Sequence, residues 1–367
     1  MSAESEGLTG QQCDERCKEF ASITGTDTAL AMFYLQDRNW NLERSLDAFF
    51  ESGTGDSAPP IPSVNQSAVS AEGASDTAKN HNHGHDERGM KRSAAVAMPE
   101  EGEPDTDNKR IRLMSWNIDG LDEKNLETRT DAVIDTILRE SPDIVFLQEV
   151  IDQTQTQIRE RCSNYAMVSA YDPNAGMVDQ YFVCIMMKKS TVKCKKGNID
   201  LIEFPNSVMS RNLLKVKAKV KGVEFTLMTS HLESTKDYRN ARVAQLQMAF
   251  KEMREAPDDD TVVFGGDLNL RDKEVPDIPD GIVDLWVNTG SRPEAKYTWD
   301  MTRNINLPQM QRFKPRLRFD RLYMRPAKQK RAVKPVYFEL IGLEKIHKCG
   351  RFPSDHWGLM VHFDNLV

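Results

Sequence analysis

The chain has 367 residues, which is long for one domain and suggests two, and 39% of them are hydrophobic, enough for a core if part of the chain is disordered. No apolar run reaches the roughly 18 residues of a membrane-spanning helix, and the N-terminus lacks the basic and apolar segments of a secretory signal. The net charge of −7 conceals a contrast, because residues 1–108 carry 8 basic and 20 acidic residues whereas residues 109–367 carry 41 and 36. Six cysteines form no Cys-x-x-Cys pair, which indicates reduced thiols. We therefore expect a nuclear or cytoplasmic protein that spans no membrane, with a mildly basic main part that suits a polyanionic substrate.

Residues 1–52 predict a small bundle of three helices. Asp27 and Asn41 are suitable N-caps for the second and third helices, because a short polar side chain can satisfy free amides of the first turn. The apolar side chains at helical spacing are Cys17, Phe20 and Ala21, then Leu30, Phe33 and Tyr34, then Leu42, Leu46, Phe49 and Phe50.

Residues 53–108 predict a disordered linker. Ser, Ala, Gly, Asn, Pro and acidic residues dominate it, and aromatic residues are almost absent, so the segment cannot build a core. Its histidines, His81, His83 and His85, are interpreted as part of a solvated tract. Lys91-Arg92 and Lys109-Arg110 are weak candidates for a split nuclear-import signal.

From residue 109 onward, apolar runs of strand length alternate with helical patterns. Strands are expected at 111–116, 144–147, 181–187, 213–220, 225–229, 261–264, 319–323, 336–341 and 359–363, and helices at 126–140 and 236–255. In the fourth of these strands, apolar residues alternate with lysines that continue to Lys221, so one face should be core and the other solvated.

Four polar fragments each follow a hydrophobic run. They are Trp116-Asn117-Ile118, Leu147-Gln148-Glu149-Val150, Gly265-Gly266-Asp267-Leu268-Asn269 and Ser354-Asp355-His356-Trp357. Together they supply side chains that can hold one divalent cation, position a phosphate and activate a water. Glu149 would be costly at the end of a buried strand unless it met a cation, and Mg²⁺ needs only one or two carboxylates. Asp267 and Asn269 would point the same way if their stretch stayed extended, and the two glycines would let the backbone approach closely.

In this order, the fragments resemble the endonuclease/exonuclease/phosphatase family of metal-dependent phosphodiesterases, over roughly residues 109–367. The resemblance implies an α/β fold that is a four-layer α/β/β/α sandwich, with two packed sheets flanked by helices. It also implies Mg²⁺ as cofactor, with Mn²⁺ as an alternative ion.

The resemblance assigns the metal side of the site. Glu149 resembles the principal metal ligand, and Asn117 lies near the metal and the phosphate. Asp267 resembles the residue that accepts a proton from the attacking water. For Asp355, three roles stay open: it binds the metal directly, binds it through water, or orients a histidine.

The phosphate side is assigned in the same way. His231 and His356 resemble the two histidines that contact the phosphate, and Asn269 would orient the water or a phosphate oxygen. Ser234 and Arg271 closely follow two of these motifs, which makes them candidate phosphate contacts.

Longer motifs resemble one group of the family, the type-2 tyrosyl-DNA phosphodiesterases. They are Asn117-Ile118-Asp119-Gly120-Leu121, His231-Leu232-Glu233-Ser234, Tyr297-Thr298-Trp299-Asp300 and Phe319-Asp320-Arg321. The resemblance implies release of a tyrosyl peptide, the remnant of topoisomerase II, from the 5′ phosphate of single-stranded or overhanging DNA. Four apolar side chains are candidates to stack a terminal base, namely Tyr181, Trp299, Leu307 and Phe319. The alternating cations Arg312, Lys314, Arg316 and Arg318 are candidate phosphate contacts.

The same group carries an N-terminal ubiquitin-associated domain, which residues 39–50 resemble, so ubiquitin is a candidate partner of residues 13–52. The first loop departs from that family's Met-Gly-Phe pattern with Ile23-Thr24-Gly25. Two alternatives to the tyrosyl-DNA activity remain. One is an abasic-site or 3′-end nuclease of the same fold, and the other is a ubiquitin-dependent adaptor with an inactive phosphodiesterase-like domain.

Overall fold

The structure is a computed structural model that describes residues 10–24, 31–32, 34–35, 38, 40–42, 44–46, 109–170, 181–310, 314–329 and 331–367. The chain divides into two units, residues 1–103 and 104–367. The predicted linker lies outside the described residues, as do Asp27, Leu30, Phe33, Phe49, Phe50 and Arg312. Within the described ranges, every helix is too short or too polar to span a lipid bilayer.

The N-terminal unit contains α1 (Gly10–Thr24) and further helical residues at 31–32, 34–35, 42 and 44–46. Cys17 and Phe20 on α1 are buried against Ala31 and Leu35, which agrees with the apolar face predicted for the first helix. Asn41 Oδ1 accepts a hydrogen bond of 3.0 Å from the amide of Arg44, which is the contact predicted for its capping role.

The second unit alternates strands with helices. Its strands are β1 (Arg110–Asn117), β2 (Ile144–Val150), β3 (Tyr165–Ser169), β4 (Phe182–Lys188), β5 (Val192–Glu203), β6 (Asn212–Val220), β7 (Val223–Ser230), β8 (Thr261–Asp267), β9 (Val283–Asp284), β10 (Trp299–Asp300), β11 (Arg316–Leu317), β12 (Asp320–Arg325), β13 (Val333–Ile341) and β14 (Gly358–Asn365). Its helices are α4 (Leu126–Glu140), α5 (Asp152–Arg161), α6 (Arg239–Glu255) and α7 (Leu285–Asn288), with 3-10 turns η1 (Asp272–Glu274), η2 (Pro293–Ala295) and η3 (Pro308–Met310).

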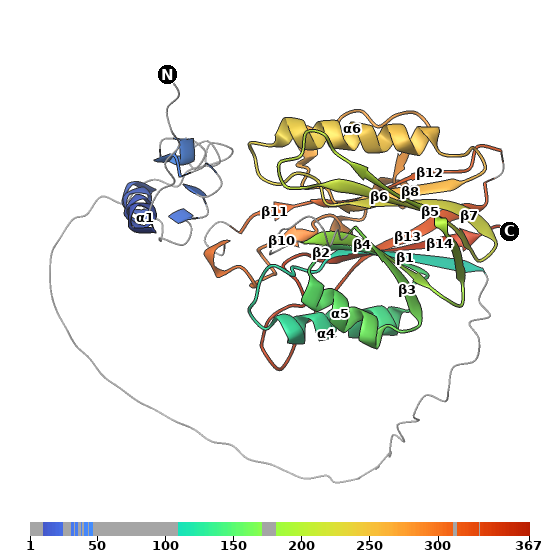
Figure 1. Cartoon of the computed structure of the whole chain (residues 1–367), viewed down its shortest axis with the longest axis horizontal. Helices are drawn as coiled ribbons and strands as arrows, with labels where there is room; N and C mark the ends of the chain where they lie inside the picture. The colour runs from blue at the N-terminus through green and yellow to red at the C-terminus, as the bar shows by residue number, and fades with distance from the viewer. Residues whose placement is uncertain are drawn as a thin grey trace, which may run out of the picture. The chain divides into compact units, whose positions relative to one another are not determined.

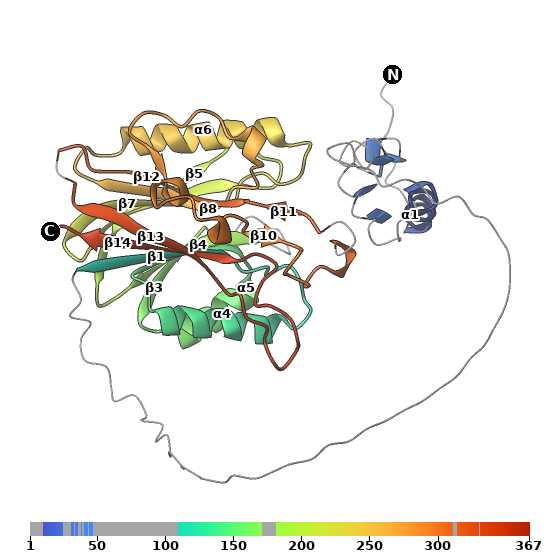
Figure 2. The ribbon, with the colours of Figure 1, turned by 180° about the vertical axis from the view of Figure 1, so that it is seen from behind.

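Two six-stranded sheets form the body of this unit. One has the order β13-β14-β1-β2-β4-β3 and the other β5-β6-β7-β8-β12-β9. Helix α6 covers the outer face of the second sheet, and α4 and α5 cover the outer face of the first (Figures 1 and 2). The predicted four-layer sandwich is therefore confirmed. A short hairpin of β10 and β11 completes the strands.

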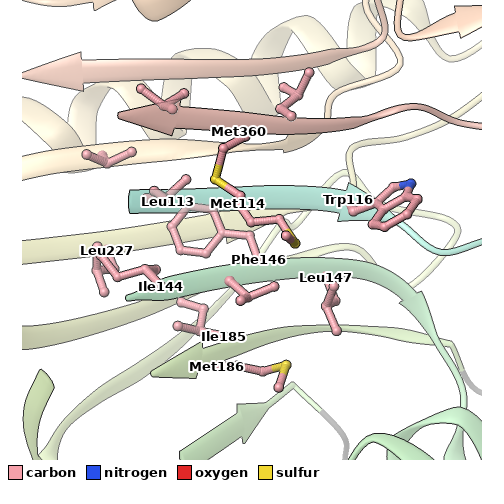
Figure 3. Packing of buried hydrophobic residues seen from close by; sticks show 14 of the residues in the cluster. Leu113, Met114, Trp116, Ile144, Phe146, Leu147, Ile185, Met186, Leu227 and Met360 are labelled. Carbon is pink, nitrogen blue, oxygen red and sulfur yellow. The ribbon is translucent and has the colours of Figure 1, made fainter. Parts of the chain in front are cut away.

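The largest hydrophobic cluster draws residues from both sheets and holds them together. Figure 3 shows side chains from β1, β2, β4, β7 and β14 gathered in it; the labelled ones are Leu113, Met114, Trp116, Ile144, Phe146, Leu147, Ile185, Met186, Leu227 and Met360. A second cluster lies where α6 packs on its sheet and includes Leu246, Phe250 and Phe264. Burial of such side chains is the main stabilising contribution, about 1.5–3 kcal/mol each.

Strand β6 alternates as predicted and Lys219 is exposed, but Lys215 and Lys221 are less solvated than expected. Lys215 lies under α6, where its Nζ is 2.9 Å from Glu252 Oε2. The prediction was wrong for Lys221, whose side chain is only 2% exposed and whose Nζ lies 3.4 Å from Asp143 Oδ1. Lys221 follows the end of β6, where its backbone is left-handed, and this turns its side chain inward to a buried carboxylate on the other sheet.

Each sheet contains one parallel pair of strands near its middle, β1 with β2 and β7 with β8. The carboxyl ends of two parallel neighbours meet at the same edge of a sheet. One backbone hydrogen bond extends each parallel pair beyond the strand ends: the amide of Ile118 donates to Gln148 O, and the amide of Leu232 donates to Asp267 O. Asn117, Glu149 and Asp267 lie at the ends of β1, β2 and β8. The fourth fragment, residues 354–357, directly precedes β14 instead, so the prediction that it follows a strand was wrong.

Candidate active site

The fragments meet around the side chain of Asn117 at the end of β1. Its Nδ2 donates to Glu149 Oε1 at 3.0 Å and to Asp267 Oδ2 at 2.9 Å, and its Oδ1 accepts from the amide of Asp119 at 2.9 Å. One neutral amide therefore holds together carboxylates from the two different sheets. Ser354, in the fourth fragment, donates to the carbonyl of Asn117 at 2.6 Å and so fixes the segment that carries His356.

Left-handed backbone places several of these residues. The φ angles are 53° at Asp119, 53° at Glu149 and 52° at Asn269. Asn269 does not continue a strand, since β8 ends at Asp267, so the condition under which Asp267 and Asn269 would point the same way is not met. Its amide instead folds back to Asp267 Oδ1 at 3.0 Å, while its Nδ2 donates to Leu232 O at 3.2 Å. Such strained residues cluster where a site imposes their geometry.

The two glycines before Asp267 let neighbouring strands approach closely, as predicted. Gly266 has a φ of 141°, and a Cβ there would lie 2.1 Å from Ser230 O. A Cβ on Gly265 would lie 2.3 Å from Arg321 O. Any side chain at either position would push a strand away from Asp267.

Two histidines flank Asp267 Oδ2, with Nε2 of His231 at 3.4 Å and Nε2 of His356 at 3.7 Å. Burial, together with the nearby cation Arg211, lowers the pKa of His231 to about 3. Burial also opposes charge on His356, but the carboxylates of Asp320, Asp355 and Asp267 outweigh it and raise its pKa well above the usual value. At neutral pH, the site therefore holds one neutral and one charged imidazole.

Of the three roles left open for Asp355, the structure gives the orientation of His356 to another residue. Its Oδ2 accepts from Trp299 Nε1 at 2.9 Å, whereas the carboxylate that pairs with His356 Nδ1, at 2.9 Å, is Asp320. Asp355 is electrostatically coupled to Glu149 instead, since burial and then the charge of Asp355 raise the pKa of Glu149 to about 7.

This crowding of acids fits a divalent cation. Ligand atoms of Glu149, His231 and Asp267 lie within 4.8 Å of one another, as do those of Asp267, Asp320 and His356. Because a hard cation prefers oxygen, the carboxylates rather than the buried histidines are its natural ligands. A cation beside Glu149 and Asp355 would relieve the repulsion that raises the pKa of Glu149.

One side of the site is aromatic. The Phe319 ring centroid lies 5.5 Å from that of Trp299 and 6.4 Å from that of His356. The Arg271 guanidinium stands 5.9 Å from the Phe319 centroid, and its Nη1 lies 3.6 Å from Glu274 Oε1. Leu307 is half-buried on the loop between β10 and η3.

The opposite side carries Tyr181, whose ring centroid lies 6.0 Å from that of His231. The guanidinium of Arg211 stands 4.7 Å from the Tyr181 centroid. Ser234, three residues after His231, donates to Met209 Sδ at 3.1 Å. Arg211 is 6% exposed, and no carboxylate among the described residues forms an ion pair with it, so an anionic ligand would compensate its buried charge.

Two of the cations before Phe319 have structural partners. Arg318 is buried and binds Asp284 with both Nη atoms, at 2.8 and 2.6 Å, so its prediction as a phosphate contact was wrong. Arg316 pairs with Asp300 at 3.0 Å and stacks over Tyr297. Arg316 is half-exposed and Arg318 is buried although they are two residues apart, because β11 ends at Leu317.

Sequence reasoning did not assign Asp320 or Arg211 to the site. Asp320 stands in the quoted motif Phe319-Asp320-Arg321 at the start of β12. A carboxylate that borders an apolar strand, as Glu149 and Asp267 also do, was a usable signal. Arg211 lies in a loop without a distinctive pattern, and only the pairing of β6 with β7 brings it beside His231.

Comparison with family models agrees with both units. Residues 114–356 match the model of the endonuclease/exonuclease/phosphatase family, and residues 14–56 match that of a UBA-like domain. Tyrosyl-DNA phosphodiesterase 2 of Homo sapiens is 40% identical over 355 residues, covering 96% of this chain and 92% of that protein. The Xenopus laevis protein of the same name is 37% identical over 373 residues, covering 99% and 96%.

Solved structures give the same result. Tyrosyl-DNA phosphodiesterase 2 of D. rerio, complexed with single-strand DNA product, is 39% identical with a TM-score of 0.65, covering 70% of this chain and 99% of that one. The enzyme of that name from C. elegans is 34% identical with a TM-score of 0.62, covering 99% and 97%. A family protein from Bacteroides vulgatus, 17% identical with a TM-score of 0.55, shares the fold. The chain thus belongs to the endonuclease/exonuclease/phosphatase family and, within it, to the tyrosyl-DNA phosphodiesterase 2 family.

Proposed function

We propose that the chain is a DNA-repair phosphodiesterase that hydrolyses the 5′-phosphotyrosyl bond between DNA and a peptide, leaving a 5′ phosphate. The observation that supports this function is the set of contacts to Oδ2 of Asp267. Asn117 Nδ2 lies at 2.9 Å, His231 Nε2 at 3.4 Å and His356 Nε2 at 3.7 Å. A carboxylate base is thereby placed between a neutral and a charged imidazole, beside the acidic pair of Glu149 and Asp355.

We propose Mg²⁺ as the cofactor, with Mn²⁺ as an alternative ion, held by Glu149 and Asp355. A divalent cation so placed supplies Lewis-acid stabilisation of charge on the phosphate. Asn117 orients both Glu149 and Asp267 through its Nδ2, and it therefore fixes the position of the metal ligand relative to the base.

The protein groups divide the remaining work. Asp267 takes the proton from the attacking water, and Asn269, anchored to Leu232 O and Asp267 Oδ1, orients that water or a phosphate oxygen. His356, held charged by Asp320, stabilises the negative charge that grows on the phosphate oxygens. His231 stays neutral and donates one hydrogen bond to the same phosphate.

The leaving group favours a tyrosyl ester. Tyrosine leaves as a phenolate, whose conjugate acid has a pKa of about 10, and needs little help from a general acid. The roles proposed above use Glu149, Asp355 and Asp267 without assigning a carboxylic acid to the leaving oxygen. The aromatic side chains of Trp299 and Phe319 support stacking of a terminal base from a single strand.

A substrate panel tests this function. Single strands and overhangs with a 5′-phosphotyrosyl end should release tyrosine in the presence of Mg²⁺, faster than an internal abasic site or a 3′-phosphotyrosyl end is cleaved. Asp267→Asn protein, purified in the same way, controls for contaminating nucleases. Faster abasic-site incision would establish the alternative nuclease of the same fold. Failure to cleave any of these substrates would reject the proposed activity and favour the adaptor.

Two partners belong to the proposal. The peptide on the DNA is a remnant of topoisomerase II, which places the reaction in the nucleus. Residues 13–52 bind ubiquitin weakly, a role supported by the UBA-like match at residues 14–56. An NMR titration of residues 1–60 should show shifts with excess ubiquitin, and unchanged spectra would reject the binding role.

A further inference from the structure

Glu233 is a fully buried carboxylate that neither the metal nor the base chemistry uses. It follows His231-Leu232 directly and is 0% exposed. Four donors converge on it: Ser207 Oγ at 2.8 Å, the amide of Val208 at 2.8 Å, the amide of Met209 at 2.9 Å, and Gln245 Nε2 at 3.0 Å. Hydrogen bonds to a buried charged acceptor are strong, so this carboxylate fixes the loop of residues 207–209 firmly.

The hydrogen bonds continue from Glu233 to Arg211. Ser207 Oγ, which donates to Glu233, also accepts from the amide of Arg211 at 2.7 Å. The guanidinium of Arg211 then stands over Tyr181, beside His231. The Nη2 of Arg211 also lies 3.7 Å from Sδ of Met209, whose amide donates to Glu233, so the guanidinium takes its position from the loop that Glu233 and Ser207 hold.

Helix α6 anchors the other end of this chain of contacts. Gln245 donates to the Glu233 carboxylate and accepts from the Glu233 amide at 2.9 Å, so both sides of its amide group are engaged. Arg242 Nη1 donates to Glu233 O at 3.4 Å and is itself fixed by Glu274 at 2.8 Å. A rigid helix therefore sets where Glu233 stands.

We propose that Glu233 is a positioning residue, whose carboxylate holds the 207–211 loop so that Arg211 stands where it binds the substrate phosphate. The assignment rests on the proposed function, because Arg211 needs an anionic substrate to act on. Arg211 lies beyond hydrogen-bonding distance of Asp267 in the described contacts, so its effect falls on binding and leaves the proton transfer intact. Loss of the Glu233 charge should therefore raise KM and change kcat little.

The test is a double-mutant cycle on the full chain with a 5′-phosphotyrosyl single strand. Glu233→Gln keeps the shape but not the charge, and it should raise KM about fivefold, as expected for weakened hydrogen bonds to a buried group. Arg211→Ala should raise KM at least as much. Because Glu233 acts through Arg211, adding Glu233→Gln to Arg211→Ala should change KM by less than twofold.

Asp143→Asn is the matched control. Asp143 is an equally buried carboxylate that accepts the amide of Arg112 at 2.9 Å, but it lies at the start of β2, away from the strand ends that form the site. It should lower the Tm and leave KM unchanged. If Glu233→Gln does not fold, Ser207→Ala interrupts the same connection and should show the same non-additivity with Arg211→Ala.

Fluorescence anisotropy with a 5′-phosphorylated oligonucleotide measures binding without turnover. The same ranking of variants in Kd supports the positioning role even if tyrosine is not released, which separates its failure from that of the proposed function. The proposal is overturned if the KM effects of Glu233→Gln and Arg211→Ala multiply. An unchanged KM in Glu233→Gln, or an equal rise in Asp143→Asn, also overturns it.

Discussion

Nδ1 of His356 lies 2.9 Å from Oδ2 of Asp320, and both side chains are buried. The carboxylate fixes the ring, so that Nε2 is directed toward Asp267 at 3.7 Å. Since the pKa of His356 is raised despite its burial, both nitrogens carry protons at neutral pH. The histidine can then place a fixed positive charge on the phosphate.

Asp320→Asn should remove that charge at neutral pH. The raised pKa of His356 means that the active, protonated form persists to high pH and is lost as the pH rises through it. The variant lowers this pKa, so kcat should fall about tenfold to hundredfold at neutral pH, and the alkaline limb of the pH profile should move to lower pH. An alkaline limb that stays in place would contradict the role of Asp320.

Glu149→Gln should fold normally and lose most of its turnover at ordinary Mg²⁺ concentration, because the cation loses an anionic ligand. Higher Mg²⁺ should restore part of the rate. Circular dichroism and Tm measurements serve as folding controls. A folded variant with the wild-type rate would remove Glu149 from the metal site.

Affinity for Mg²⁺ should rise with pH. The cation binds the ionised form of Glu149, whose pKa is raised to about 7, so a proton competes with the metal below that pH. Calorimetric titration at pH 8 should show tighter binding than at pH 6, by about tenfold. The Glu149→Gln protein should lose this dependence, and an unchanged dependence there would assign it to another group.

Asp267→Asn should impair proton transfer from the attacking water, whereas Glu149→Gln impairs metal binding. The substrate and the cation still bind, but the attacking water loses its base, so kcat should fall by about 10²–10⁴ while KM changes little. Steady-state kinetics with a 5′-phosphotyrosyl substrate separates the two parameters. If KM alone rises, Asp267 serves binding instead.

Residues 109–367 alone should retain nearly full activity on small substrates, since every group assigned to the chemistry lies within them. The rate of tyrosine release should match that of the full chain at equal concentration. A large loss of kcat on deletion of residues 1–108 would show that the N-terminal part contributes to catalysis.

The fold was predictable where hydrophobic pattern and length agree. Helix α4 occupies its predicted range, 126–140, because Val133, Ile134 and Ile137 form one buried face and Pro142 follows it. Strand β5 and helix α5 were missed, because β5 is a lysine-rich edge strand and α5 has few apolar residues. Short strands such as β10 and β11 depend on tertiary contacts that local pattern does not encode.

The candidate site was predictable where polar residues end apolar strands, as for Asn117 and Glu149. Partnerships across the chain were not, since the pairing of Asp320 with His356 joins residues 36 positions apart. Charged residues were misleading: Lys221 was expected on a solvated face and Arg318 at a phosphate, but each meets a buried carboxylate. Alternation in the sequence predicts on which face of a strand a side chain lies, but it does not predict which residue of another element pairs with it.

The pairing of β1 with β14 joins the first and last strands of the catalytic unit, with Arg110 opposite Asp364. A ribosome that has already synthesised Asn117, Glu149 and Asp267 has still to add His356 and β14, the strand between β13 and β1. Non-local contacts of this kind form late and slowly. Hydrolytic activity should therefore arise only after β14 has paired with β1 and has brought His356 to the groups that earlier parts of the chain supply.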